Sequence, residues 1–207
     1  MRARLFRASA LATALVGWYG LISPRLPRRG QPLVNAALGT GLVVASRAPL
    51  GLRPPRLCSG LRIGFAVAAP IVAAVAASTA IAPVRAAMTE RELPASPSLW
   101  LGVRIPVGTV WSEEAAFRAA LGTVSADAFG PTVGRLVQSL AFGLSHIDDA
   151  RATGDPVAGT VVATAVAGWF FALLGERSAS LAAPMLAHLA INEAGAVAAL
   201  AVQRRGR

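Results

Sequence analysis

The sequence predicts an all-α fold, a polytopic bundle of six to seven transmembrane helices. Two features carry this prediction. Of the 207 residues, 55% are hydrophobic and only 14% are charged, and the mean hydropathy is +0.57, which is too apolar for an ordinary water-soluble domain. The apolar residues also form long Ala-rich runs instead of alternating ten-residue segments, so helices are the expected spanning elements.

The lengths of the apolar runs indicate the individual spans. A transmembrane helix needs about 20 mostly apolar residues to cross a hydrocarbon core of about 30 Å. Four runs meet this requirement, at residues 8–24, 63–84, 156–175 and 181–202. Residues 32–46 form a shorter run that either spans with help from its neighbours or lies at the interface. Residues 99–124 and 131–147 are apolar but carry ionisable side chains, which are costly at membrane depth and usually mark a functional site.

The basic residues fit a bilayer environment. The formal charge is +10 and the pI is about 11.7, yet the arginines gather at the edges of apolar runs, where they can face lipid phosphates. No segment interleaves a basic face with aromatic residues on a soluble fold, so we expect no nucleic acid as a partner. All 20 basic residues are Arg, and with the abundant Ala, Gly and Pro this suggests a GC-rich, bacterial coding sequence.

The N-terminus and the single cysteine narrow the possibilities further. Arg2, Arg4 and Arg7 precede the first apolar run as they would in a signal peptide, but several spans follow, so we interpret this run as a first anchor. Cys58 is the only cysteine, which rules out an internal disulfide and a cysteine-based metal site. We therefore expect a multi-pass integral protein of the cell membrane.

The first polar cluster in the apolar C-terminal half contains Glu113, Glu114 and Arg118. On a helix, Glu114 and Arg118 lie about 40° apart around the axis and can form an ion pair, whereas Glu113 lies about 140° from Arg118 and points elsewhere. Glu113 is then a carboxylate without a local ion-pair partner. Such a carboxylate can accept a proton and act as a general base. A membrane-edge segment with solvated charges would give the same pattern.

The chain has only two histidines, and each lies in a further polar cluster. His146 ends the apolar run that begins near residue 131. His188 and Asn192 are one helical turn apart, so the imidazole and the carboxamide share a face and can both donate hydrogen bonds into a cavity. Taken singly, His146 is explained as a structural or solvated residue, and His188 with Asn192 as an interhelical hydrogen-bond pair. A shared site explains all three clusters together.

In this order the three clusters resemble the motifs of the CPBP family, also called Abi or CAAX protease type 2. The family's pattern is a doubled glutamate followed after three residues by Arg, then Phe-x-x-x-His, then His-x-x-x-Asn. Its positions here are Glu113, Glu114, Arg118, Phe142, His146, His188 and Asn192. We expect residues 98–203 to form the protease core, after N-terminal spans of unassigned role at residues 1–97 and before a basic tail at residues 204–207. Two features depart from the family: Ala119 stands where many members have Gly, and the loop after His146 is unusually acidic.

The resemblance implies an intramembrane endopeptidase whose helices enclose a polar catalytic cavity. Glu113 would deprotonate a water molecule that His146 binds and orients, and His188 and Asn192 would hold the developing oxyanion. Glu114 and Arg118 would support the site. These are the parts that peptide hydrolysis needs when no serine or cysteine nucleophile is present.

Two other functions stay open from the sequence. A non-catalytic immunity or scaffold protein would retain the polar cluster for helix packing. A proton-coupled transporter would also use intramembrane Glu, His and Arg, although no repeated halves or paired discontinuous helices are visible.

We expect neither a cofactor nor a metal. Glu113, His146 and His188 would suffice as three zinc ligands, but the two histidines are far apart in the chain, unlike those of a His-Glu-x-x-His helix. The expected partners are the lipid bilayer and a peptide or membrane-protein substrate.

Overall fold

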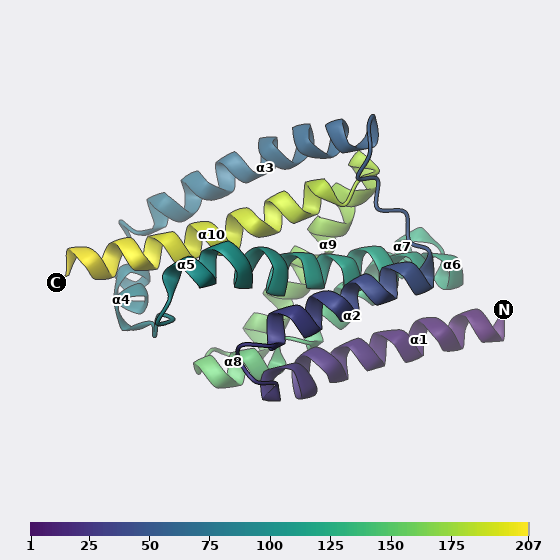
Figure 1. Ribbon diagram of the computed structural model, residues 1–207, viewed down its shortest axis with the longest axis horizontal. Helices are drawn as coiled ribbons and strands as arrows, with labels where there is room; N and C mark the ends of the chain where they lie inside the picture. The colour runs from purple at the N-terminus through teal and green to yellow at the C-terminus, as the bar shows by residue number, and fades with distance from the viewer. Residues whose placement is uncertain (207) are drawn as a thin grey trace.

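The computed structural model describes residues 1–206, and within this range every regular element is helical (Figure 1). The letter η marks helical turns wound more tightly or more widely than an α-helix. In chain order the elements are α1 (Arg2–Gly17), η1 (Trp18–Ile22), η2 (Ser23–Arg25), α2 (Gln31–Ser46), α3 (Arg56–Ser78), α4 (Ala82–Glu90), α5 (Pro97–Leu99), η3 (Trp100–Trp111), η4 (Glu114–Leu121), α6 (Gly122–Phe129), α7 (Pro131–Leu144), α8 (Ile147–Thr153), α9 (Val157–Ser178) and α10 (Ala182–Arg205).

The length and hydropathy of four helices confirm the four predicted membrane-spanning runs. These helices are Arg2–Arg25, Arg56–Ser78, Val157–Ser178 and Ala182–Arg205. The chain is therefore an all-α helical membrane bundle. The second helix differs from its predicted range: it begins at Arg56 and ends at Ser78, because the chain turns after Ser78 and Pro83 opens the separate helix α4, a position that proline tolerates well.

The remaining apolar stretches also form helices inside the bundle. α2 has 16 residues, or about 24 Å at 1.5 Å per residue, and it packs along η3 and η4. This contact is close because of Gly39, where an added Cβ would lie 2.8 Å from the carbonyl oxygen of Ser112. Small residues allow such close helix packing in lipid, where association gains little from the hydrophobic effect. A total of six to seven spans, which includes these stretches, stays a prediction.

One long helix carries the glutamate motif through the bundle. α5, η3, η4 and α6 follow one another without a break, because the joining residues Ser112, Glu113 and Gly122 have right-handed helical backbone angles. In Figure 1 this teal helix crosses the molecule between α10 and α2, and its η3 part contacts both. All eight residues of η4 are buried. Side chains in this stretch therefore face other helices and not lipid.

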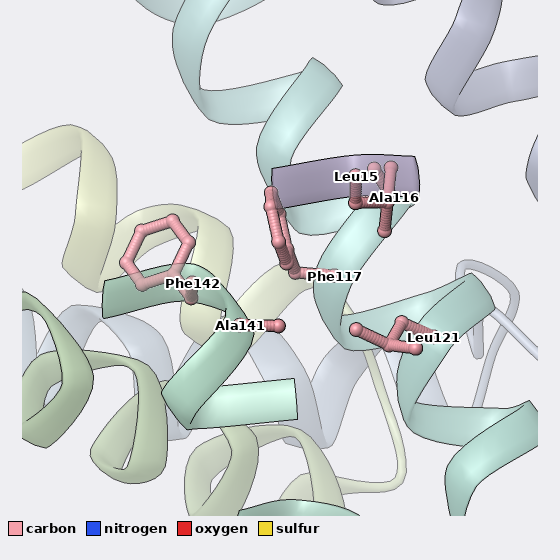
Figure 2. Close-up of a cluster of buried hydrophobic side chains, with 6 residues drawn as sticks. All are labelled: Leu15, Ala116, Phe117, Leu121, Ala141 and Phe142. Atoms are coloured by element: carbon pink, nitrogen blue, oxygen red, sulfur yellow. The ribbon is translucent and has the colours of Figure 1, made fainter. Parts of the chain in front are cut away.

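An apolar cluster fixes α1 and α7 to the long helix. Its members are Leu15 of α1, Ala116, Phe117 and Leu121 of η4, and Ala141 and Phe142 of α7 (Figure 2). The rings of Phe117 and Phe142 meet edge to face with their centroids 5.2 Å apart, a preferred aromatic geometry. Phe142 belongs to the first histidine motif, so this packing brings that motif to the glutamate motif.

The distribution of polar residues suits a bilayer. Large apolar side chains such as Phe65, Val166 and Val197 are exposed on the outer surface, where lipid would cover them. Glu114, Arg118, Gln138 and His188 are buried inside the bundle. Ionisable groups that face the interior of a membrane protein generally mark a functional centre.

Candidate active site

The two adjacent glutamates at the junction of η3 and η4 point to different surroundings. The Glu114 side chain is fully buried, and its Oε2 lies 3.4 Å from Nε of Arg118. This contact confirms the ion pair that the four-residue spacing predicts. The Glu113 side chain is 14% exposed and lines a cavity. Its buried Oε2 has no hydrogen-bond partner within the protein, so this carboxylate keeps unused capacity to accept a hydrogen bond.

Arg118 is held among aromatic rings behind the cavity. Its guanidinium carbon lies 3.8 Å from the ring centroid of Phe142 and 5.2 Å from that of Phe171. These are cation–π distances, and such contacts strengthen when water is excluded. Arg118 therefore connects η4 with α7 and α9 and neutralises the buried charge of Glu114.

His188 of α10 lies between the two glutamates. Its Nδ1 is 2.8 Å from Oε1 of Glu114, and its Nε2 is 3.8 Å from Oε2 of Glu113. An ionised carboxylate only accepts hydrogen bonds, so the pairing with Glu114 assigns the proton to Nδ1. The contact with Glu113 is too long for a hydrogen bond. The His188 ring also stacks on Phe171, with centroids 5.0 Å apart, and the imidazole is fixed in orientation.

His146 follows the C-terminus of α7 and lines the same cavity as Glu113. Its Nδ1 lies 2.8 Å from the carbonyl oxygen of Phe142. A carbonyl only accepts, so Nδ1 carries the hydrogen and Nε2 of the neutral ring keeps a free lone pair. The ring packs against Phe142 at a centroid distance of 4.6 Å. Phe142 thus touches both histidines, since its ring centroid also lies 6.2 Å from that of His188.

The cavity has a volume of about 290 Å³ and is predominantly polar. Its lining comprises Tyr19, Ser23, Pro24, Gln31, Pro32, Asn35, Pro94, Trp100, Arg104, Gly108, Thr109, Glu113, Ser145, His146 and Asp149. The pKa of Asp149 is raised because the carboxyl is partly withdrawn from water, and the neighbouring His146 acts in the opposite direction. A cavity of this size and polarity has room for several water molecules beside Glu113.

The structure corrects one expectation about this site. We expected Glu113, His146, His188 and Asn192 to line one cavity, but the lining contains only the first two. His188 is covered by Phe171 and turned to Glu114. The carboxamide of Asn192 donates to the carbonyl oxygen of His188 in its own helix, at 3.1 Å, and is not directed at the cavity.

The sequence reasoning missed the contribution of the first 97 residues. Tyr19, Ser23, Gln31 and Asn35 line the cavity, and a hydrogen-bond network joins most of them. Asn35 accepts from Nε1 of Trp18 at 3.0 Å and donates to Oγ of Ser23 at 2.8 Å, and Gln31 donates to the same hydroxyl at 3.2 Å. The sequence did contain an indication of this contribution, because Asn35 is a polar residue within an apolar run, as Asn192 is.

The same side chains are the candidates for metal ligation. Among residues 1–206, no three His, Cys, Asp or Glu side chains are grouped so that they would hold a metal ion. Glu113 and His146 share the cavity, but Nδ1 of His188 is engaged by Glu114. Catalysis without a metal stays a prediction.

Comparison with known proteins agrees with the motifs. Residues 95–194 match the family model of the Rce1-like type II CAAX prenyl endopeptidases. This part of the chain belongs to the CAAX protease family, which supports a membrane protease as the class of protein. No curated protein and no solved structure matches the chain.

Proposed function

We propose that this chain is a multi-pass intramembrane endopeptidase in which Glu113 activates a water molecule. The observation that carries the proposal is the pairing of Glu113 and His146 in one polar cavity, with an unpartnered carboxylate oxygen on one and a free ring nitrogen on the other. A water molecule between them would donate one hydrogen to each acceptor. This arrangement exposes the oxygen lone pairs to a substrate carbonyl.

The proposed reaction begins when Glu113 takes a proton from this water. The hydroxide adds to the peptide carbonyl carbon, and the carbonyl oxygen becomes an oxyanion. Glu113 then gives its proton to the amide nitrogen, the C–N bond breaks, and a carboxylic acid and an amine leave. His146 keeps the water in line throughout. No serine or cysteine nucleophile and no cofactor is needed.

His188 and Asn192 are proposed to act on the oxyanion side of the reaction. The contact with Glu114 fixes the His188 ring so that Nε2 faces Glu113, and Nε2 would donate to the oxyanion only when both ring nitrogens carry a hydrogen. Asn192 would supply a second donor only after its carboxamide leaves the His188 carbonyl oxygen. Glu114 and Arg118 hold this part of the site and take no part in proton transfer.

The proposed partners are a lipid bilayer and a peptide or membrane-protein substrate. The polar lining of the cavity and the apolar outer surface support this combination. Water must reach Glu113 from one side of the bilayer, which we propose to be the side of Gln31, Arg104 and Asp149, because these polar lining residues are half-buried or exposed.

A competing hypothesis is that the polar cluster serves only to hold the helices together. The Glu114–His188 contact favours it, because it ties η4 to α10 at depth. Glu113 distinguishes the two functions. It lines the polar cavity, which Glu114 does not, so a packing role does not require its charge, whereas the proposed reaction does.

The test compares membrane proteomes from cells that carry wild type, Glu113→Gln or the control Glu90→Gln, whose residue is exposed on α4. Labelling of new N-termini should reveal cleavage products in wild type and in Glu90→Gln that are missing in Glu113→Gln. Equal amounts of folded protein must be present in all three. Identical products in all three would refute the proposed protease.

A further inference from the structure

Tyr19 is the one tyrosine of the chain, and it lies in the wall of the candidate active site. It belongs to η1, at the end of the first membrane-spanning helix. Its ring packs against Phe117 with centroids 5.3 Å apart. Phe117 is fully buried in the cluster that joins α1, η4 and α7. The phenol is therefore anchored at its apolar end, and it lines the cavity together with Glu113 and His146.

The Tyr19 hydroxyl is buried and lies near the side chain of Ser112, but it makes no hydrogen bond of normal geometry within the protein. Its polar neighbours behave differently, because Trp18, Ser23 and Asn35 satisfy one another. Burying a hydroxyl without a partner is unfavourable, so such a group usually serves a water molecule or a ligand. In this position the ligand is whatever occupies the cavity beside Glu113.

The proposed reaction lacks a free donor for the oxyanion in this arrangement. Nδ1–H of His188 is used by Glu114, and the Asn192 carboxamide is used by the backbone of its own helix. Tyr19 offers a phenolic O–H, which can donate to an anionic oxygen. It is also held rigidly, and preorganised donors are the ones that lower a reaction barrier.

We propose that Tyr19 donates a hydrogen bond to the oxyanion that forms when water adds to the peptide carbonyl. This inference rests on the proposed protease function. It gives the first membrane helix a catalytic role, with the oxyanion donor on η1 and the general base on the long central helix. The hydroxyl keeps its proton throughout, so it stabilises charge and takes no part in proton transfer.

The first experiment is Tyr19→Phe, assayed with a peptide that spans a cleavage site found in the proteome comparison. The ring and its contact with Phe117 remain, and only the donor is lost. We expect kcat to fall by about 10²–10³-fold, as for other oxyanion donors, with KM changed by less than about threefold. Thr13→Val is the matched control, since it removes an exposed hydroxyl from α1 and should leave kcat unchanged. Wild-type kcat in Tyr19→Phe would overturn the proposal.

The second experiment keeps the hydroxyl and alters its acidity. Tyr19 is the only tyrosine, so incorporation of fluorinated tyrosines in place of tyrosine changes this position alone. A more acidic phenol is a stronger hydrogen-bond donor, so kcat at neutral pH should rise as fluorines are added. A purely structural Tyr19 predicts no such trend, and an unchanged kcat would reject the inference even if Tyr19→Phe failed to fold.

The two proposals fail in different ways. If Glu113→Gln cleaves the peptide as wild type does, the protease mechanism itself is wrong. If Glu113→Gln is inactive while Tyr19→Phe and the fluorinated proteins behave as wild type, the base is supported and only the role of Tyr19 is refuted.

Discussion

Glu113 and Glu114 are neighbours in the chain, but they belong to two differently organised regions. The region around Glu114 is closed: Arg118 and His188 surround the carboxylate, and Phe142 and Phe171 cover the cation. The region around Glu113 is open to a polar cavity, which Glu113 lines and Glu114 does not. A helix directs consecutive side chains to different faces, so one motif serves both regions.

This difference suggests that Glu114 supports the structure of the site, whereas Glu113 takes part in the reaction. A buried charge that is already paired is neutralised within the protein. Removing one partner leaves the other charge buried and unpaired, which destabilises the fold. A carboxylate beside water keeps its capacity to exchange a proton. Each of the following variants affects one of the two regions, and together they test whether the division holds.

The largest effect is expected for Glu113→Gln. This substitution keeps the shape of the side chain but removes the base, and turnover should fall by at least about 10²–10⁴-fold, the usual contribution of general acid–base catalysis. The melting temperature in detergent should match that of wild type, because Oε2 of Glu113 has no hydrogen-bond partner to lose. Peptide cleavage and thermal unfolding on one preparation check both parts. A variant that unfolds would mean that the Glu113 charge, too, has a supporting role.

Arg118→Ala should affect stability first. It leaves Glu114 buried without its cation, which typically costs about 3–5 kcal/mol, and yield and melting temperature should drop. Arg4→Ala is a suitable comparison, because the Arg4–Asp127 pair is exposed, with side chains 64% and 60% accessible, and such a pair contributes less than about 1 kcal/mol. Equal stability of the two variants would contradict the supporting role of Arg118.

A rescue experiment sharpens this result. Replacing both partners, as Glu114→Gln with Arg118→Met, removes the buried pair without stranding a charge, and such replacements are often nearly neutral for stability. We expect the double variant to recover most of the yield lost in Arg118→Ala. Activity should recover less, because His188 loses the carboxylate that orients its ring. Full recovery of activity would show that Glu114 does not position His188.

A smaller effect is expected for Asn192→Ala. The carboxamide makes one hydrogen bond, to the carbonyl oxygen of His188, and a bond of this kind contributes about 0.5–1.5 kcal/mol to stability. The loss of kcat should be clearly smaller than that in Tyr19→Phe. Measuring kcat of Asn192→Ala and Tyr19→Phe side by side shows which side chain contributes more to catalysis. If Asn192→Ala loses more, the carboxamide rotates towards the substrate and is the principal oxyanion donor.

No effect is expected from chelation of metals. Purified protein treated thoroughly with a chelator should cleave its peptide at the untreated rate, because Glu113 and His146 are proposed to act on water directly. Metal analysis of the active preparation accompanies the assay. Loss of activity that zinc alone restores would make Glu113, His146 and His188 the candidate ligands.

Local properties of the chain decided much of the architecture. The four long spans follow from hydropathy, because a helix satisfies its own backbone in a bilayer and its length must match the hydrocarbon core. The Glu114–Arg118 pair is likewise local, since four residues make one turn. The order of the three motifs also gave the family, which the match over residues 95–194 confirms.

The tertiary structure decided which polar groups meet. His188 is 74 residues from Glu114 in the chain, and Tyr19 reaches the cavity of Glu113 from a region without any family motif. Asn192 has the same sequence spacing whether it faces the cavity or its own helix, so spacing alone did not reveal its hydrogen bond to His188. Periodicity fixes the face on which a side chain lies, whereas the packing of Phe117, Phe142 and Phe171 between helices determines what that face contacts.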